Sequence, residues 1–383
     1  MGVIERQIKS RLAERLQTGG KVVLVYGARQ VGKTTLVRQV LSDLNYNTLS
    51  INADEGRFID ILSSRDLRQL RGLVAGYEAV FIDEAQRIPE IGINLKLLVD
   101  HFPQLRLVVT GSSSLDLASK VQEPLTGRTW THTLYPIATS ELGATLTPFN
   151  LREGLTERLI YGSYPEVFAI QNHADKRDYL LGLTASYLYK DILEMGGIRN
   201  PTGLRSLVRL LAHQIGQQIS LTELGTQLQI SKDTVASYID LLEKSFVVFR
   251  LSGFSRNLRK EISKQSKIYF WDVGVRNAVL DDHKRIEERP DRGQLWENLV
   301  IAERLKYVAY ARLPIHLYFW RTYDAVEIDI VEEQEGALRA VECKWGNAKS
   351  RLPASFQQAY PGVPFETIRP DNFLAYLTGS ANT

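Results

Sequence analysis

The sequence has 383 residues, of which 44% are hydrophobic and 24% are charged, and 47 basic against 44 acidic residues leave a net charge of +3. This composition excludes collagen-like, coiled-coil and wholly disordered proteins and favours two or three globular domains. One cysteine, Cys343, excludes a fold held by intramolecular disulfides. Apolar runs are short and the N-terminus has no apolar export segment, so we expect a cytoplasmic protein with no membrane partner.

Residues 1–145 alternate short β-rich runs with helical patterns. Four of these runs have the length and apolar content of buried strands: 21–26, 48–52, 79–82 and 105–110. Strands that alternate with helices are typical of an α/β domain with a parallel sheet. We therefore expect such a domain over the first third of the chain.

A complete phosphate-binding loop follows the first strand. With the next threonine it comprises Gly27, Ala28, Arg29, Gln30, Val31, Gly32, Lys33, Thr34 and Thr35. The glycines let backbone N–H groups close around phosphates at the N-terminus of the helix that follows. The loop predicts ATP as the ligand, with Lys33 on the β- and γ-phosphates and the Thr34 hydroxyl on Mg²⁺.

The strand at 79–82 leads directly into two acids, Asp83 and Glu84. Strand ends beside a phosphate loop are where an α/β sheet binds its ligand. We expect Asp83 to coordinate Mg²⁺ through water and Glu84 to polarise the attacking water. Without the phosphate loop, the same pair would indicate only the start of a surface loop.

Two further positions in this domain are candidates for nucleotide chemistry. The strand at 105–110 ends in hydroxyls, so Thr110 or Ser112 would sense the γ-phosphate or orient water; the alternative is a helix N-cap before Leu115. Arg128 lies at the far side of the domain and would reach the nucleotide of a neighbouring subunit. The alternative for Arg128 is a surface salt bridge.

The rest of the chain divides into three segments. Residues 146–200 have helical patterns, which we interpret as a lid-like segment. Residues 201–285 contain two short helices, a tight turn between them and β-rich runs after them, a pattern that suggests a winged helix-turn-helix. The polar stretch 281–291 indicates a loop or linker, and 286–383 forms the last domain.

Basic residues gather after the second helix of the winged-helix segment. That helix itself carries two lysines against three acids, which is poor for attracting phosphate. The following stretch has one acid, Glu261, and five basic residues, Arg256, Arg259, Lys260, Lys264 and Lys267. We expect a basic wing that grips DNA through its phosphates; a solvated loop and a protein-docking surface are the alternatives.

A strand pattern near the C-terminus carries acids at a suggestive spacing. Residues 326–331 and 338–345 alternate like the strands of a hairpin, which puts Glu342 and Lys344 on one face. With Asp329, and with Glu297 on the preceding helix, they resemble the PD-(D/E)XK nuclease core. The resemblance implies a second Mg²⁺ or Mn²⁺ site on the three acids, with Lys344 activating or orienting water. Such folds cut nucleic acid or persist as binding modules, and both alternatives stay open.

An ordered set of motifs links these segments. It consists of the phosphate loop, FIDEAQ at 81–86, VVTGSSS at 108–114, LTGRT at 125–129, YGSYPE at 161–166, YKDI at 189–192 and KIYFWDVG at 267–274. The set resembles the prokaryotic AAA-type ATPases whose C-terminal half is a domain of unknown function. The resemblance covers nearly the whole chain and implies an AAA+ core that hydrolyses ATP at subunit interfaces. It also implies a ring-like homo-oligomer, with six subunits as the expected number, and favours Arg128 as an arginine finger.

We therefore predict an α/β P-loop AAA+ ATPase domain, a helical lid, a winged helix-turn-helix and an α/β nuclease-like domain. The predicted activity is Mg²⁺-dependent ATP hydrolysis coupled to the binding or processing of DNA, such as branched or damaged DNA. One alternative is an ATP-gated, metal-dependent endonuclease. Another is a regulatory or defence ATPase that remodels a protein partner.

Overall fold

The computed structural model describes residues 4–112, 125–186, 198, 200–255, 266–322 and 324–379. The chain divides into two compact units. The N-terminal unit contains Glu5–Pro136 and Lys244–Phe246, and the C-terminal unit contains Met1–Ile4, Ile137–Glu243 and Val247–Thr383. Within the described ranges, no helix combines the length and the apolar character that crossing a membrane requires.

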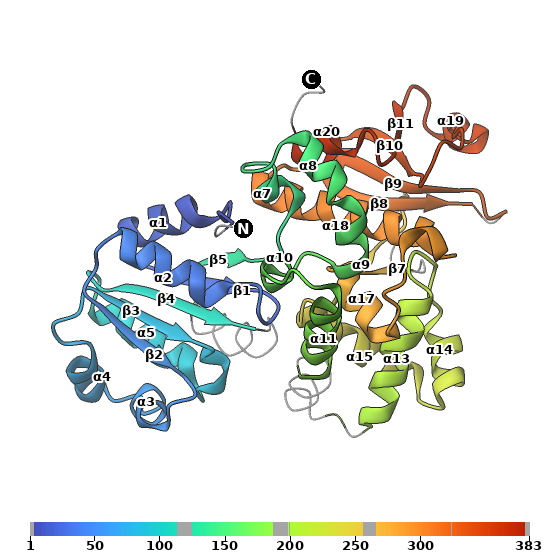
Figure 1. The fold of residues 1–383 in the computed structure, drawn as a ribbon. Helices are drawn as coiled ribbons and strands as arrows, with labels where there is room; N and C mark the ends of the chain where they lie inside the picture. The colour runs from blue at the N-terminus through green and yellow to red at the C-terminus, as the bar shows by residue number, and fades with distance from the viewer. Residues whose placement is uncertain are drawn as a thin grey trace. The chain divides into compact units, whose positions relative to one another are not determined.

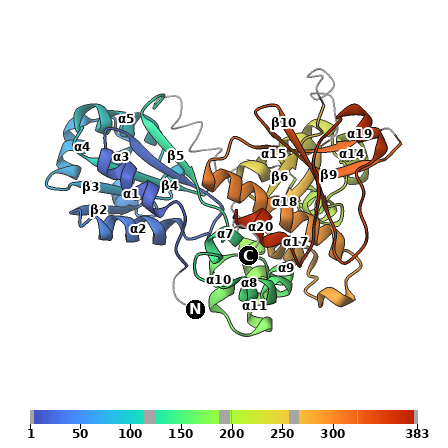
Figure 2. The ribbon, with the colours of Figure 1, turned by 90° about the horizontal axis from the view of Figure 1, so that it is seen from above.

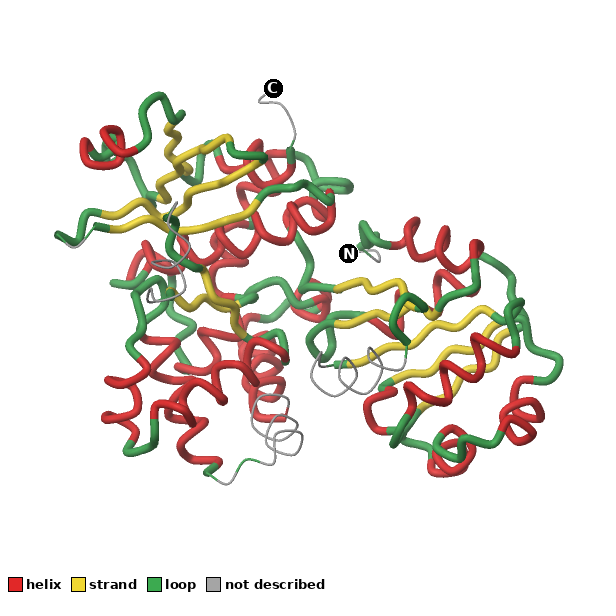
Figure 3. Tube along the Cα trace, turned by 180° about the vertical axis from the view of Figure 1, so that it is seen from behind, coloured by secondary structure: helices red, strands yellow, loops and turns green. Residues whose placement is uncertain are grey.

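The N-terminal unit is built on a five-stranded parallel sheet in the order β2-β3-β4-β1-β5 (Figure 3, yellow). Its strands are β1 (Val22–Tyr26), β2 (Thr48–Asn52), β3 (Ala79–Asp83), β4 (Arg106–Gly111) and β5 (Thr129–Thr133). The first four confirm the predicted strands. The sequence pattern missed β5 because this edge strand, TWTHT, lacks the apolar run that marks the buried strands.

Helices cover both faces of this sheet (Figure 1). They are α1 (Lys9–Thr18), α2 (Lys33–Asp43), α3 (Gly56–Leu62), α4 (Leu67–Val74), the 3₁₀ turn η1 (Ala85–Arg87) and α5 (Ile91–His101). Alternate β1 residues Val22 and Leu24 share a core with Leu95 and Leu98 of α5. The intervening β1 side chains are also fully buried, and α1 and α2 contact the strands. Burial on both faces explains the continuous apolar runs of the sequence.

The first part of the C-terminal unit is mainly helical. Its helices are α7 (Thr139–Leu142), α8 (Pro148–Glu153), α9 (Leu155–Tyr161), α10 (Pro165–Ala169), α11 (His173–Leu183), α13 (Pro201–His213), α14 (Leu221–Leu228), α15 (Lys232–Lys244) and α17 (Val273–Leu280). Ser220 starts α14 by accepting a hydrogen bond from the Glu223 N–H. The strands β6 (Val248–Leu251) and β7 (Lys267–Phe270) then pair antiparallel. These elements match the pattern expected for 201–285, and their assignment as a winged helix remains a prediction.

A four-stranded sheet in the order β11-β10-β9-β8 forms the other part of the C-terminal unit. The elements are α18 (Arg292–Ala311), β8 (His316–Arg321), β9 (Glu327–Gln334), β10 (Ala337–Cys343), α19 (Ala354–Ala359), β11 (Phe365–Ile368) and α20 (Phe373–Thr378). The predicted hairpin is confirmed: β9 and β10 pair antiparallel, and Glu335 and Gly336 turn the chain with positive φ. Helix α18 packs on β10 and α20 packs on α18 (Figures 1 and 2).

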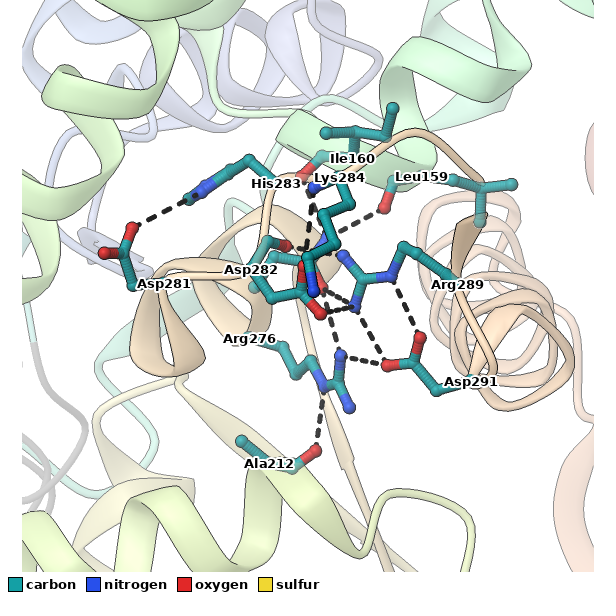
Figure 4. Close-up of polar contacts among 11 residues, drawn as sticks. Leu159, Ile160, Ala212, Arg276, Asp281, Asp282, His283, Lys284, Arg289 and Asp291 are labelled. Carbon is teal, nitrogen blue, oxygen red and sulfur yellow. Dashed lines mark hydrogen bonds and ion pairs between the residues drawn. The ribbon is translucent and has the colours of Figure 1, made fainter. Parts of the chain in front are cut away.

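The connection from α17 to α18 contains buried charge, although its composition had indicated a polar loop or linker. It is a loop with one 3₁₀ turn, η3 (Ile286–Glu288). Arg289 donates two hydrogen bonds of 2.9 Å to Asp291, and Arg276 of α17 donates to the Ala212 carbonyl of α13 at 2.8 Å (Figure 4). Both arginines are only 2% exposed. The segment is therefore a packed junction between helices and not a solvated linker.

Candidate nucleotide and carboxylate sites

The phosphate loop joins β1 to α2 in a conformation that requires its glycines. At Gly27 the φ angle is 151°, and an added Cβ would lie 2.1 Å from the Leu134 carbonyl oxygen that follows β5. Gly32 is left-handed, with φ of 96°, and α2 begins at the next residue. Because the first N–H groups of a helix have no partner within it, those of α2 are available to an anion in the loop.

Lys33 lies buried over this loop. Its Nζ donates to the carbonyl oxygens of Gly27 at 2.9 Å and Ala28 at 2.8 Å. Burial lowers the pKa of Lys33 to about 8, although Glu84 and Asp83 act in the opposite direction. Phosphate oxygens would supply the negative charge that stabilises a buried ammonium. The residues present therefore fit a nucleotide phosphate.

Three side chains connect the loop to the ends of β3 and β4. Thr34 Oγ1 donates to Asp83 Oδ2 at 2.7 Å, and the Thr110 hydroxyl donates to Asp83 Oδ1. The Glu84 N–H donates to Thr110 Oγ1 at 3.3 Å. Hydroxyl and carboxylate oxygens are ligands that Mg²⁺ prefers, so Thr34 and Asp83 fit this ion beside the loop. Thr110 is buried behind Asp83 and holds it; its role as a phosphate sensor stays a prediction.

Glu84 has a second partner that the sequence pattern did not single out. Gln86 Nε2 donates to Glu84 Oε2 at 2.5 Å and to Ser112 Oγ at 3.0 Å. Gln86 is 9% exposed, and Glu84 has a left-handed backbone with φ of 53°. The available signal was the position of Gln86 two residues after Glu84 within the motif at 81–86. The N-cap alternative for Ser112 involves residues outside the described ranges.

Arg128 lies at the amino ends of the sheet strands, whereas the phosphate loop lies at their carboxyl ends. Arg128 directly precedes β5, whose Thr129 pairs with Val22 at the start of β1, whereas the loop follows the end of β1. At about 3.3 Å per residue, the whole strand separates Arg128 from the loop of its own chain. Arg128 Nε bonds Asp100 Oδ1 at 2.8 Å, so the salt bridge considered as an alternative is present. Both side chains are partly exposed.

The predicted acids of the C-terminal unit come together. Glu297 of α18 and Asp329 of β9 line a cavity of about 420 Å³ with Lys344. Glu342 of β10 is ion-paired to Lys344 at 2.5 Å, and Asp329 Oδ2 accepts the Cys343 N–H at 2.8 Å. Burial raises the pKa of Glu297, with a further contribution from Asp329. Burial also raises the pKa of Asp329, with a further contribution from Glu342.

Lys267 corrects the prediction of a DNA-gripping group that included it. Its side chain is 1% exposed and its Nζ bonds Glu297 and Glu327, so it cannot contact DNA phosphates. The other four members of that group, Arg256, Arg259, Lys260 and Lys264, lie outside the described residues.

The second metal site on these acids stays a prediction. Among the described residues, no three His, Cys, Asp or Glu side chains are arranged to hold a metal ion. Glu297, Asp329 and Glu342 are each engaged by a donor of the protein itself. Each of the three acids is therefore hydrogen-bonded or ion-paired within the protein.

Similarity to known proteins covers the whole of the nucleotide site. Residues 19–143 match a family described as an AAA domain, which includes every position from Gly27 to Arg128. Residues 152–285 and 292–371 match two domains of unknown function, DUF8612 and DUF4143.

Two relatives extend this similarity along the chain. The uncharacterized protein Rv2008c of Mycobacterium tuberculosis is 31% identical over 349 residues, 89% of this chain and 74% of that protein. The uncharacterized protein MJ1544 of Methanocaldococcus jannaschii is 25% identical over 320 residues, 79% of this chain and 69% of that protein. Among solved structures, the RuvB Holliday junction branch migration motor of Thermotoga maritima aligns at 18% identity with a TM-score of 0.32. That alignment covers 64% of this chain and 90% of RuvB, and a likeness of this degree carries no functional argument.

Proposed function

We propose that this chain, which belongs to the family of AAA-domain proteins that includes Rv2008c of Mycobacterium tuberculosis, is a Mg²⁺-dependent ATPase coupled to the binding or processing of DNA. The observation that carries the ATPase is the hydrogen-bonded series Thr34–Asp83–Thr110 beside the phosphate loop and Lys33. Thr34 lies in the first turn of α2, Asp83 ends β3, and Thr110 lies next to the end of β4. These residues are far apart in the chain, and the parallel sheet brings them together at the carboxyl ends of its strands.

Each side chain has a chemical task in hydrolysis. The loop N–H groups and Lys33 bind the phosphates, and Thr34 and Asp83 would hold Mg²⁺, which neutralises charge on the phosphate oxygens when bound. The Glu84 carboxylate orients a water molecule and accepts its proton. Gln86 fixes the direction of that carboxylate, and Thr110 fixes Asp83.

Arg128 would complete the site of a neighbouring subunit. Arg128 lies at the amino ends of the strands, a whole strand length from the loop of its own chain, so it would act on another chain. Self-association into a ring-like homo-oligomer, with six subunits expected, would bring it to a neighbour's γ-phosphate. Asp100 then holds the guanidinium in the separated chain.

The basic run before β7 supports DNA as the partner. Without Lys267 it retains Arg256, Arg259, Lys260 and Lys264 against one acid, Glu261. Four closely spaced cations without a matching set of acids favour contact with phosphates and a strong dependence on salt.

A protein partner is the second candidate. The observation that favours it is the charge of α15, which carries two lysines and three acids and would repel a phosphate backbone. In that case the helices α14 and α15 would dock a polypeptide, and the ATPase would remodel it.

The test is the steady-state rate of ATP hydrolysis with no DNA, single strands, duplex or a four-way junction, at low and moderate salt. Lys33→Ala is the blank, and metal-dependent cutting is scored in the same reactions to detect an ATP-gated endonuclease. We expect several-fold stimulation by one DNA form, weakened by salt. Arg259→Glu with Lys260→Glu should remove the stimulation, whereas Arg209→Glu, on the exposed face of α13, should not. Equal rates on every DNA would reject DNA coupling and leave the protein partner.

A further inference from the structure

Lys267 places a charged side chain inside a group of acids on other elements. It begins β7, and its Nζ lies 3.2 Å from Glu297 Oε1 of α18 and also bonds Glu327 Oε1 of β9. The ring of Phe319, on β8, lies 5.5 Å from the same nitrogen. We call Glu297, Glu327, Asp329 and Glu342 the carboxylate cluster. The ammonium of this β7 residue therefore contacts side chains of α18, β8 and β9.

The carboxylate cluster is also contacted by other donors of the protein. Tyr269 Oη donates to Glu297 Oε1 at 2.5 Å, next to Lys267 on the same oxygen. The Cys343 N–H donates to Asp329, and Lys344 pairs with Glu342. Arg321 lies 3.4 Å from the second oxygen of Glu327. The cluster is thus supplied with cations and donors from within the chain.

A divalent ion would compete for the same oxygens. Mg²⁺ and related ions bind carboxylate oxygens at about 2.0–2.6 Å and need several of them together. An ion on Glu297 and Asp329 would stand next to the Lys267 ammonium, and two cations that share one carboxylate repel each other. Because Lys267 already holds Glu297 Oε1, a metal ion on that oxygen would have to displace the ammonium.

We propose that the ammonium of Lys267 is the resident cation of the carboxylate cluster, in the place that a divalent metal ion would take in the nuclease core that the sequence resembles. The cluster then serves as a partly buried ionic contact that holds β7 against α18 and β9. The side chain of Lys267 is 1% exposed, and its ion pairs with Glu297 and Glu327 supply the countercharge for the ammonium. While Lys267 is in place, the cluster does not take up Mg²⁺ or Mn²⁺.

The test measures Mn²⁺ uptake by the full-length chain without nucleotide, from the spectrum of free Mn²⁺ in electron paramagnetic resonance. All proteins carry Asp83→Asn, so the nucleotide site contributes no metal ligand from that position. We expect no uptake with Lys267 present. Lys267→Met, which keeps the length of the side chain and removes its charge, should lower the melting temperature and take up one Mn²⁺ per chain. Millimolar Mn²⁺ should then restore much of the melting temperature.

Lys306→Met is the matched control. Lys306 is also 1% exposed and pairs with an acid, Glu303, at 2.7 Å, but it lies outside the carboxylate cluster. Its loss should lower the melting temperature without creating Mn²⁺ uptake. Should Lys267→Met fold poorly, adding Glu327→Gln removes one of the unpaired charges, keeps Glu297 and Asp329 for Mn²⁺, and should recover stability. Mn²⁺ uptake by the chain that retains Lys267, or a soluble Lys267→Met chain with no uptake, would overturn the proposal.

Discussion

Thr34 at the start of α2 and Asp83 at the end of β3 are joined by a hydrogen bond of 2.7 Å from Oγ1 to Oδ2. The two strands that precede them are not neighbours, because β4 lies between β1 and β3. The interposed strand brings Thr110, which donates to the other oxygen of Asp83. The two oxygen ligands expected for Mg²⁺ are therefore already adjacent, and a third side chain fixes one of them.

Thr110→Val should remove this support while keeping the shape of the side chain. Outer-shell partners of metal ligands are typically worth about 10–100-fold in metal affinity or activity. We expect a loss of that size in ATP hydrolysis, partly recovered at high Mg²⁺, with little change in nucleotide binding measured without Mg²⁺. Thr110→Ser keeps the hydroxyl and should remain close to the unmodified protein. Equal rates for the valine and serine variants would show that the hydrogen bond to Asp83 has no role in catalysis.

Gln86→Leu should lower kcat without a matching change in KM for ATP. The amide of Gln86 holds Glu84, so its loss leaves the carboxylate present but free to turn away from the attacking water. Removing a general base costs about 10²–10⁴ in rate, and misdirecting one should cost less. Glu84→Gln removes the general base itself and gives the rate with which the Gln86→Leu rate is compared. A Gln86→Leu rate equal to that of the unmodified protein would mean that Glu84 does not need this contact.

The sequence predicted the parts of the nucleotide site whose determinants lie close together in the chain. The phosphate loop directly follows β1, and Asp83 is the last residue of β3, so a motif and an apolar run were enough to locate these residues. Lys267 was wrongly assigned to a DNA surface because its environment depends on Glu297 and Glu327, which lie 30 and 60 positions later. The burial of Arg289 could not be read locally either, since a run of charges looks the same in a solvated loop. Tertiary contacts, which the local pattern does not contain, decide both cases.

Asp291 should make stability depend on pH in the acid range. Burial alone would raise the pKa of Asp291, but hydrogen bonds and charge from Arg289 and Arg276 lower it to about 2. A carboxylate whose pKa is lower in the folded state stabilises the protein above its unfolded value, near 4, and loses this contribution as the pH falls toward 2. A shift of this size corresponds to about 2 kcal/mol at neutral pH.

Asp291→Asn should therefore be less stable by about 2 kcal/mol at pH 7, measured by urea unfolding, and the difference should shrink between pH 4 and pH 2. Asp324→Asn is the control, because Asp324 is exposed on the loop between β8 and β9. A stability difference that stays constant over the acid range would mean that the Asn substitution acts through packing and not through charge.

Arg128→Ala should abolish ATP hydrolysis, and mixing this variant with Lys33→Ala should restore part of it. The sheet places Arg128 away from the loop of its own chain, so an arginine finger can act only on a neighbour. Such fingers are worth about 10³–10⁵ in rate in related nucleotide hydrolysis. Arg128→Ala and Lys33→Ala chains should each be inactive, but a mixture contains interfaces where an intact loop meets an intact Arg128. We expect hydrolysis to return in the mixture, to a fraction of the unmodified rate set by the statistics of random assembly.

Two controls separate this outcome from a loss of the surface salt bridge. Asp100→Ala breaks the same ion pair from the other side and should leave hydrolysis intact, because Arg128 itself remains. Arg65→Ala removes another exposed, paired arginine of the same unit, bonded to Glu90 at 2.5 Å, and should have little effect. If Asp100→Ala is as inactive as Arg128→Ala and the mixture stays inactive, the ion pair is structural and the finger must be sought elsewhere. Recovery in the mixture alone would establish that each active site is shared between two chains, because neither variant can supply both groups.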